Sequence, residues 1–208
     1  MARMHALVLY LLTLLPAVAT CITNSGKTAC GYHCLAAHGE VACARTAAGV
    51  CGATDSNLVC WDPSDTVRAH YGDRVPRPEC RTRGGTVVCG YHCETADSEV
   101  RCAATPDGIC ATTLRGVTCW DPPAASYCAD QNSLPRPKCI SVNGYTACGY
   151  GCLARNGELA CALTPGGSCQ TAPSGIVCSD PESPPLCGGQ PCRPDDPVTG
   201  RPWCRPPK

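Results

Sequence analysis

The chain has 208 residues, of which 22 are cysteine and none is phenylalanine, and its formal net charge at pH 7 is +0. A cysteine content this high is typical of a scaffold in which disulfides replace a large apolar core. The balanced charge argues against a nucleic-acid-binding protein and against a cationic membrane-lytic peptide.

The first predicted element is a signal peptide over residues 1–19. Arg3 stands in a short polar start, an apolar run covers Ala6–Leu15, and Ala17 and Ala19 form an A-x-A cleavage site. This run is too short to span a bilayer, and no later stretch is longer. We therefore predict a secreted protein, periplasmic or extracellular, without a transmembrane segment.

A lipid anchor on Cys21 is not expected. The residue before a lipidated cysteine should be small, and Thr20 fits that position poorly. Cys80 and Cys139 also hold the same place in their repeats with no signal before them. Cys21 is thus explained as a framework cysteine.

Three cysteine ladders with the same spacing, C-x8-C-x3-C-x8-C-x7-C-x8-C, make up most of the remaining chain. They begin at Cys21, Cys80 and Cys139. The predicted division is repeat 1 (20–63), a linker (64–79), repeat 2 (80–122), a linker (123–138), repeat 3 (139–181) and a Pro-rich, cysteine-containing tail (182–208).

The C-x8-C segments are predicted to be β-hairpins. Most carry a turn dipeptide at their centre, namely Ser25-Gly26, His38-Gly39, Gly84-Gly85, Asp97-Ser98, Asn143-Gly144 and Asn156-Gly157. A two-residue turn there places both cysteines in a non-hydrogen-bonded pair, about 4.5 Å apart, within reach of a disulfide. In the last segment of repeats 2 and 3 the turn residues come one position later, at Arg115-Gly116 and Ser174-Gly175, and we expect a four-residue loop ending in glycine.

This register proposes that neighbouring cysteines pair. The bonds would be Cys21–Cys30, Cys34–Cys43, Cys51–Cys60, Cys80–Cys89, Cys93–Cys102, Cys110–Cys119, Cys139–Cys148, Cys152–Cys161 and Cys169–Cys178. An interlocked pattern that crosses between hairpins is the alternative. The four extra cysteines, whose pairing stays open, are Cys128, Cys187, Cys192 and Cys204.

The predicted fold class is small, disulfide-rich and mainly β, with three tandem six-cysteine modules of short β-hairpins. Each repeat is expected to hold about six short strands, with Gly31-Tyr32-His33 as a tight connection between two of them. No segment shows an apolar period of 3.6 residues over a helical length, so we expect negligible helix outside the signal peptide.

Two recurring residue types are candidates for binding. His33 and His92 flank cysteines, and Cys30-x3-Cys34 has a spacing that zinc sites use. Exported cysteines oxidise, however, so we expect no metal or cofactor and place the histidines in surface turns. The recurring aromatics either contact a sugar or protein partner or cover disulfides in place of a core, which we favour; they are Tyr32, Tyr91, Tyr150, Trp61 and Trp120.

The recurring acids suggest no catalytic site. An aspartate precedes a proline at the end of each repeat, at Asp62, Asp121 and Asp180, where it is expected to start a turn by bonding local amides. Glu40, Glu99 and Glu158 also align and read as strand-edge surface residues. No nucleophile, triad or phosphate-loop pattern accompanies them, so we predict a protein that is not an enzyme.

Cys30-Gly-Tyr-His-Cys34, followed by Cys60-Trp-Asp-Pro63, resembles a cysteine-rich module repeated in secreted bacterial proteins. The resemblance covers all three ladders, although the third copy has Gly151 for histidine and Ser179 for tryptophan. It implies a secreted bacterial repeat protein and no particular activity.

The predicted function is therefore a secreted, non-enzymatic, disulfide-stabilised repeat protein with a structural or binding role in the cell envelope or the medium. Its partner would be a protein or glycan rather than a nucleic acid. One alternative is a metal-binding protein. The other is a multi-headed protease inhibitor that uses three clamped loops, at Thr46–Val50, Thr105–Ile109 and Thr164–Ser168.

Overall fold

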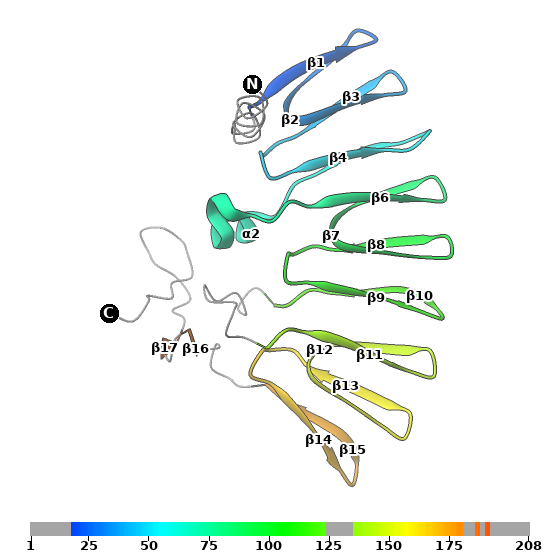
Figure 1. Cartoon of the computed structure of the whole chain (residues 1–208), viewed down its shortest axis with the longest axis vertical. Helices are drawn as coiled ribbons and strands as arrows, with labels where there is room; N and C mark the ends of the chain where they lie inside the picture. Colours follow the sequence, from blue (N-terminus) through cyan, green and yellow to red (C-terminus); the bar gives the residue numbers. More distant parts are fainter. Residues whose placement is uncertain (1–17, 124–134, 181–185, 188–189, 192–208) are drawn as a thin grey trace, which may run out of the picture.

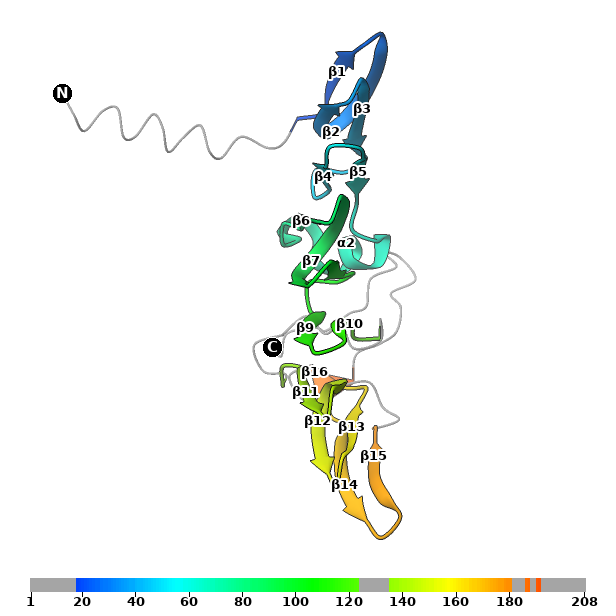
Figure 2. The same ribbon diagram turned by 90° about the vertical axis from the view of Figure 1, so that its right-hand side faces the viewer.

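The computed structural model describes residues 18–123, 135–180, 186–187 and 190–191. The predictions for residues 1–17, for Cys128, Cys192 and Cys204, and for the side chain of Cys187 lie outside this part of the chain. Within it the protein is mainly β, and hairpins from the three repeats stack one after another into an elongated array (Figure 1). A view turned by 90° shows that the array is narrow and twists along its length (Figure 2).

Each repeat contributes five strands in the same order. Repeat 1 forms β1 (Thr20–Asn24), β2 (Lys27–Ala37), β3 (Glu40–Ala44), β4 (Val50–Ala53) and β5 (Leu58–Trp61). Repeat 2 forms β6 (Glu79–Arg83), β7 (Thr86–Ala96), β8 (Glu99–Ala103), β9 (Ile109–Thr113) and β10 (Gly116–Trp120). Repeat 3 forms β11 (Lys138–Val142), β12 (Tyr145–Arg155), β13 (Glu158–Ala162), β14 (Ser168–Ala172) and β15 (Gly175–Ser179). Two short strands, β16 (Leu186–Cys187) and β17 (Gln190–Pro191), pair with each other.

The first two hairpins of each repeat close with the predicted two-residue turns. In repeat 1, Asn24 pairs with Lys27, which leaves Ser25-Gly26 as the turn. Five of the six turns of this kind hold both residues at positive φ. That geometry matches the right-handed twist of the strands, and glycine at the second position adopts it without strain.

The four-residue loop predicted for the last hairpin of repeats 2 and 3 is wrong. Thr113 pairs with Gly116, so the turn consists of Leu114 and Arg115 alone, and Pro173-Ser174 forms the same turn in repeat 3. Gly116 lies in the strand with φ at 118°, a value that favours glycine. The glycine thus marks the start of the returning strand and not the turn.

The expectation of six short strands is also wrong, because β2, β7 and β12 each continue through the predicted tight connection. In β2 the pairing register shifts between Tyr32 and Leu35, and His33 has φ at 48°. The strand folds back at this bulge, so both hairpin tips at its ends point to the same edge of the array (Figure 1).

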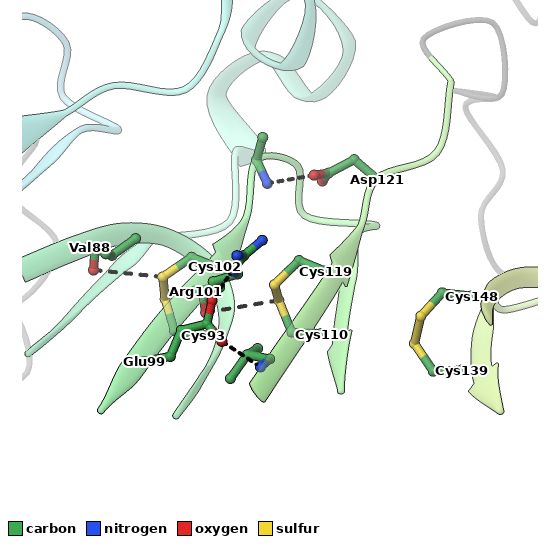
Figure 3. Close-up of a disulfide and its surroundings, with 12 residues drawn as sticks. Val88, Cys93, Glu99, Arg101, Cys102, Cys110, Cys119, Asp121, Cys139 and Cys148 are labelled. Carbon is green, nitrogen blue, oxygen red and sulfur yellow. Dashed lines mark hydrogen bonds and ion pairs between the residues drawn. A yellow bond between two sulfur atoms is a disulfide. The ribbon is translucent and has the colours of Figure 1, made fainter. Parts of the chain in front are cut away.

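Nine disulfides close the hairpins, and they join the neighbouring cysteines that the hairpin register pairs. Each sequence separation is 9, with Cα atoms 4.0 or 4.1 Å apart. Sulfurs contact backbone carbonyls of the hairpin before their own, as Cys102 Sγ does with Val88 at 3.6 Å. Figure 3 shows three of these disulfides following one another along the array, so sulfur fills the space between successive hairpins.

Buried apolar side chains are few and mostly small. Most of them lie in repeat 2, which has a neighbouring repeat on both sides. They are Ala44, Val67, Val87, Cys89, Tyr91, Cys93, Val100, Ala103, Val117, Tyr150 and Ala162.

One short helix was not predicted. In the first linker, α2 (Asp65–Tyr71) begins at Ser64, whose hydroxyl accepts the Val67 amide, and a 3-10 turn (Gly72–Arg74) follows. Val67 is 1% exposed, and the Tyr71 hydroxyl donates to Asp107 Oδ2 at 2.6 Å. The linker therefore packs against repeat 2. Seven residues are too few for their apolar period to be seen in the sequence.

Candidate functional site

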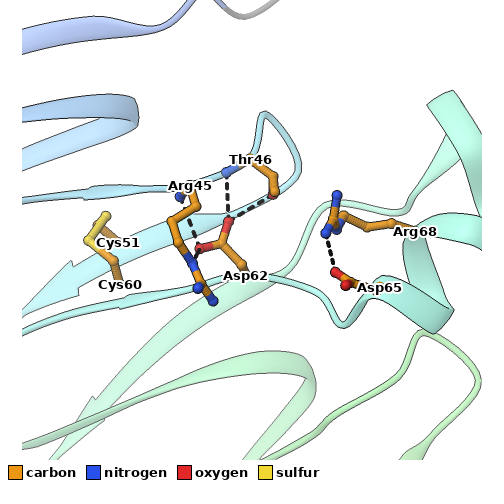
Figure 4. Close-up of polar contacts among 7 residues, drawn as sticks. All are labelled: Arg45, Thr46, Cys51, Cys60, Asp62, Asp65 and Arg68. Carbon is orange, nitrogen blue, oxygen red and sulfur yellow. Dashed lines mark hydrogen bonds and ion pairs between the residues drawn. A yellow bond between two sulfur atoms is a disulfide. The ribbon is translucent and has the colours of Figure 1, made fainter.

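Each repeat ends in an aspartate whose carboxylate holds an earlier turn of the same repeat. Asp62 accepts the Arg45 amide at 3.0 Å and the amide and hydroxyl of Thr46 at 2.8 Å (Figure 4). Asp121 and Asp180 make the equivalent bonds at 2.7 to 2.9 Å. The predicted local turn bonds are wrong, because these partners lie 16 or 17 residues away. We call this arrangement the carboxylate clip.

The held turn requires a glycine. The Gly49 amide donates to the Thr46 carbonyl at 3.0 Å, and the other two repeats show the same bond. A Cβ on Gly49 would lie 2.4 Å from Asp62 Oδ1 and 2.6 Å from the Cβ of Ala44, which is completely buried. Aspartate, threonine, alanine and glycine therefore recur because they fit one corner.

In repeat 1 the surroundings of the clip favour a charged Asp62. Burial by itself would raise the pKa of Asp62, but the bonds from the Arg45 amide and from Thr46, together with the nearby Arg45 guanidinium, hold this pKa below its ordinary value. Such a group remains an acceptor at neutral pH and is poorly suited to donate a proton.

The recurring histidines bind the same turn. His33 Nε2 lies 3.0 Å from the Ala47 carbonyl, and His92 Nε2 lies 2.8 Å from that of Pro106. The candidate zinc ligands Cys30 and Cys34 are both bound in disulfides and so offer no thiolate. Among the described residues, no group of three or more histidine, cysteine or acidic side chains is arranged to hold a metal ion.

The aligned glutamates are more than surface residues in two of the repeats. Glu99 accepts the Val117 amide at 2.9 Å, and Glu158 accepts the Ile176 amide at 3.1 Å. The Val117 amide, and then the Arg101 side chain, lower the pKa of Glu99. Glu40 instead pairs with Lys27 at the surface. In repeats 2 and 3 the carboxylate therefore ties the second hairpin to the third.

Four of the recurring aromatics join one repeat to the next through ring contacts, which sequence analysis did not predict. Trp61 meets Tyr91 edge to face with ring centroids 5.6 Å apart, and Trp120 meets Tyr150 at the same distance. Tyr91 and Tyr150 are 4% and 5% exposed, whereas Tyr32, which no tryptophan precedes, is half-buried. The tryptophans and two of the tyrosines thus face a neighbouring repeat.

The three loops considered for protease inhibition are the turns held by the carboxylate clip. Thr105–Ile109 contains the hydrogen bond from the Gly108 amide to the Thr105 carbonyl, and the Thr105 amide donates to Asp121. Inhibitory loops present an extended segment to a protease. A closed four-residue turn does not offer one.

The hairpin tips form the edge of the array away from the carboxylate clips, and sequence analysis treated them only as turns (Figure 1). At the boundary between repeats 2 and 3, Leu114 is 93% exposed and Tyr145 is 58% exposed. The Arg115 guanidinium lies 4.2 Å from the centre of the Tyr145 ring. These residues differ between repeats, since Thr86 and Lys27 stand where repeat 3 has Tyr145. A motif search looks for recurrence and so passes over them.

Together these contacts define a class of protein, a tandem stack of disulfide-closed β-hairpins with a small repeated set of polar clips. No family model, no curated protein and no solved structure matches the chain. In the described part of the chain, no helix has the length and apolar character needed to cross a bilayer.

Proposed function

We propose that this is a secreted, non-enzymatic repeat protein that serves as a structural or binding element in the cell envelope or the extracellular medium. Nine disulfides in the described residues fit an oxidising compartment. The predicted signal peptide supports export. The resemblance to bacterial cysteine-rich modules supports a bacterial source.

The observation that carries the proposal is that recurring residues and varying residues occupy different parts of each repeat. Residues that recur hold the framework: the cysteines close hairpins, the aspartates clip turns and the aromatics join repeats. Residues that vary lie at the tips, where Leu114, Arg115 and Tyr145 face outward. Repeat proteins that bind partners commonly combine a constant scaffold with a variable surface.

The tip edge at repeats 2 and 3 has the chemistry of a contact surface. Tyrosine and arginine are enriched at the energetic centres of protein interfaces, and an aromatic ring also stacks on sugars. A hollow of about 420 Å³ lies next to it at the tips of repeat 3, with Arg155, Glu158 and Pro173 in its lining. These features support a protein or glycan partner.

A lipid anchor and a metal site receive no support from the cysteines. The Cys21 sulfur is bound to Cys30, so it cannot also carry the thioether of a lipid anchor. Disulfide bonding removes the thiolates that zinc would need in the same way. For a multi-headed inhibitor the closed turns are the wrong shape. Titration against a panel of serine and cysteine proteases tests this alternative, because an inhibitor would block a protease stoichiometrically.

A pull-down from isolated envelope polysaccharides and secreted proteins tests the binding role. The tip variant carries Leu114→Ser, Arg115→Ser and Tyr145→Ser. The control carries Arg45→Ser and Leu163→Ser, whose side chains are exposed near the carboxylate clips. We expect native protein and control to retain the same ligand and the tip variant to lose it. Equal retention by all three would reject the tips as the binding edge.

A further inference from the structure

The joint between repeats is a specific surface. At the start of repeat 2, Val87, Cys89 and Tyr91 are 6%, 8% and 4% exposed, because the last hairpin of repeat 1 covers them. A Cβ on Gly52 would lie 2.7 Å from the Cβ of Cys80, so the two backbones approach closely there. Two contacts therefore make this joint: Gly52 packs against the Cys80 disulfide, and Trp61 packs against Tyr91.

Repeat 1 presents the same surface at the end of the described array. The equivalent residues are Cys21, Thr28, Cys30 and Tyr32, which we call the N-terminal face. The first three are exposed and Tyr32 is half-buried. No described segment of the chain lies over this end of the array (Figure 1). The face retains the disulfide and the tyrosine that receive a hairpin in repeats 2 and 3.

The other end of the array has lost the matching features. Where repeats 1 and 2 have Gly52 and Ala111, repeat 3 has Gln170, and where they have tryptophan it has Ser179. Both residues are exposed. Because a glutamine would collide with the facing disulfide and a serine cannot reach the tyrosine, this end does not fit the N-terminal face of a second copy. The last repeat therefore has the character of a cap.

We propose that the N-terminal face of repeat 1 docks a hairpin from another polypeptide, one that belongs to a module of this kind. Its occupant ends in Cys-Trp-Asp-Pro and has glycine or alanine at the position equivalent to Gly52. The two internal joints show what covers this surface, and the N-terminal face presents the same disulfide and tyrosine. The two polypeptides would then form a longer array of similar modules.

The chain itself supplies the probe. The double variant Gln170→Gly, Ser179→Trp restores the lost joint features at the end of repeat 3. It is expected to bind the N-terminal face of the next copy and to grow head to tail, as heterologous contacts do. The measurement is sedimentation equilibrium of the mature, oxidised double variant at concentrations up to about 1 mM, which matches the effective concentration that a short linker provides. We expect its weight-average mass to be at least double that of the monomer.

Two further variants locate the contact. Tyr32→Ala in the double-variant background should return the protein to a monomer. Thr28→Arg should do the same by placing a long charged side chain where the covering hairpin would lie, because Thr28 is exposed and its equivalent in repeat 2, Val87, is 6% exposed. This change removes only the surface hydrogen bond between Thr28 and Thr23. A monomeric double variant would overturn the proposal, and so would association that persists with both blocking changes. Association of the unaltered protein would also overturn it, by showing that the end of repeat 3 docks without the two changes.

Discussion

The polar side chains that recur in this protein satisfy backbone groups that a larger protein would pair within a sheet. Asp62 takes two amides and a hydroxyl at one corner, and His33 contacts a carbonyl of the same turn. Backbone groups left without a partner cost about 1–3 kcal/mol each when buried. A protein with few buried apolar side chains gains little free energy from burial to offset such losses, so each clip matters.

Replacing Asp62 with asparagine should open the turn that it holds. The side chain is 8% exposed, and the amide group would face a backbone N–H that it cannot accept. We expect the closed turn to be destabilised by about 1–3 kcal/mol. The measurement is hydrogen exchange, which should become faster at the amides of Arg45 and Thr46. Asp55→Asn, at an exposed loop position, is the matched control and should leave both amides protected.

Acid should weaken the array through the same group. The pKa of Asp62 is lower in the folded protein than in the unfolded chain, so its contribution is complete above the ordinary carboxyl range and is lost as the pH falls through the folded-state value. Unfolding free energies in denaturant, with disulfides intact, should fall from about pH 5 downward. Asp62→Asn should make the unfolding free energy depend less on pH in this range. An unchanged pH dependence in this variant would show that Asp62 is not the group responsible.

The hairpins are the units of stability. Each hairpin is closed by its own disulfide between cysteines with a sequence separation of 9. Closing a loop of this size stabilises the fold by up to about 2.5–3 kcal/mol, because it lowers the conformational entropy of the unfolded chain. Because every bridge is local, losing one should loosen its own hairpin and the neighbours that rest on it.

Gly108→Ala tests how closely a hairpin connection is packed. The new methyl would lie 2.3 Å from Asp121 Oδ1 and 2.6 Å from the Cβ of Ala103. Overpacking of this kind typically costs about 1–3 kcal/mol, and we expect a lower midpoint of denaturation and faster exchange of the Thr105 amide. Ala104→Val, at an exposed position beside the turn, should be nearly neutral. Equal effects of the two changes would argue against the close packing.

The whole molecule is held by contacts between nearest neighbours, as in other repeat proteins. The rings of Trp61 and Trp120 cross the two boundaries. The first linker adds α2, whose Tyr71 reaches Asp107 in repeat 2. Burial is deepest in the middle repeat because it alone has a described neighbour at both ends.

Trp120→Ala should uncouple repeat 3 from the rest. The ring pair contributes about 0.5–1.5 kcal/mol beyond its buried area. We expect faster exchange in β11 and β12 while repeats 1 and 2 stay protected, and a broader distribution of lengths in small-angle scattering. Leu163→Ala removes an apolar side chain of repeat 3 that is 54% exposed, and it should leave both measurements unchanged. Loss of protection throughout the chain would show that the repeats are not separable units.

Complete reduction should abolish the fold. The buried side chains are mostly alanine, valine and cysteine, which cannot stabilise so elongated a molecule alone. Treatment with a phosphine reductant, followed by alkylation, should remove the β signal in circular dichroism and make the chain sensitive to trypsin. A reduced chain that keeps its protease resistance would contradict the role given to the disulfides.

Sequence analysis predicted what depends on short separations. Ser25-Gly26 and the matching turns predicted the hairpins, and with them the bonds from Cys21 to Cys30 and onward. It missed α2, whose seven residues show too little periodicity, and the carboxylate clips, whose partners are 16 or 17 residues apart. It also misplaced the turn at Leu114-Arg115, because Gly116 looked like a turn residue and is the first residue of a strand.

The cysteine spacing and the turn dipeptides by themselves determined a mainly β fold of disulfide-closed hairpins, since strand register and loop closure are local properties of the chain. Only the tertiary structure decided how the hairpins stack. It placed Trp61 against Tyr91, Asp62 against Thr46 and the tips of the disulfide-closed hairpins on one edge. Those contacts arise from surfaces that face each other after folding, and spacing along the chain carries no record of which surfaces will meet.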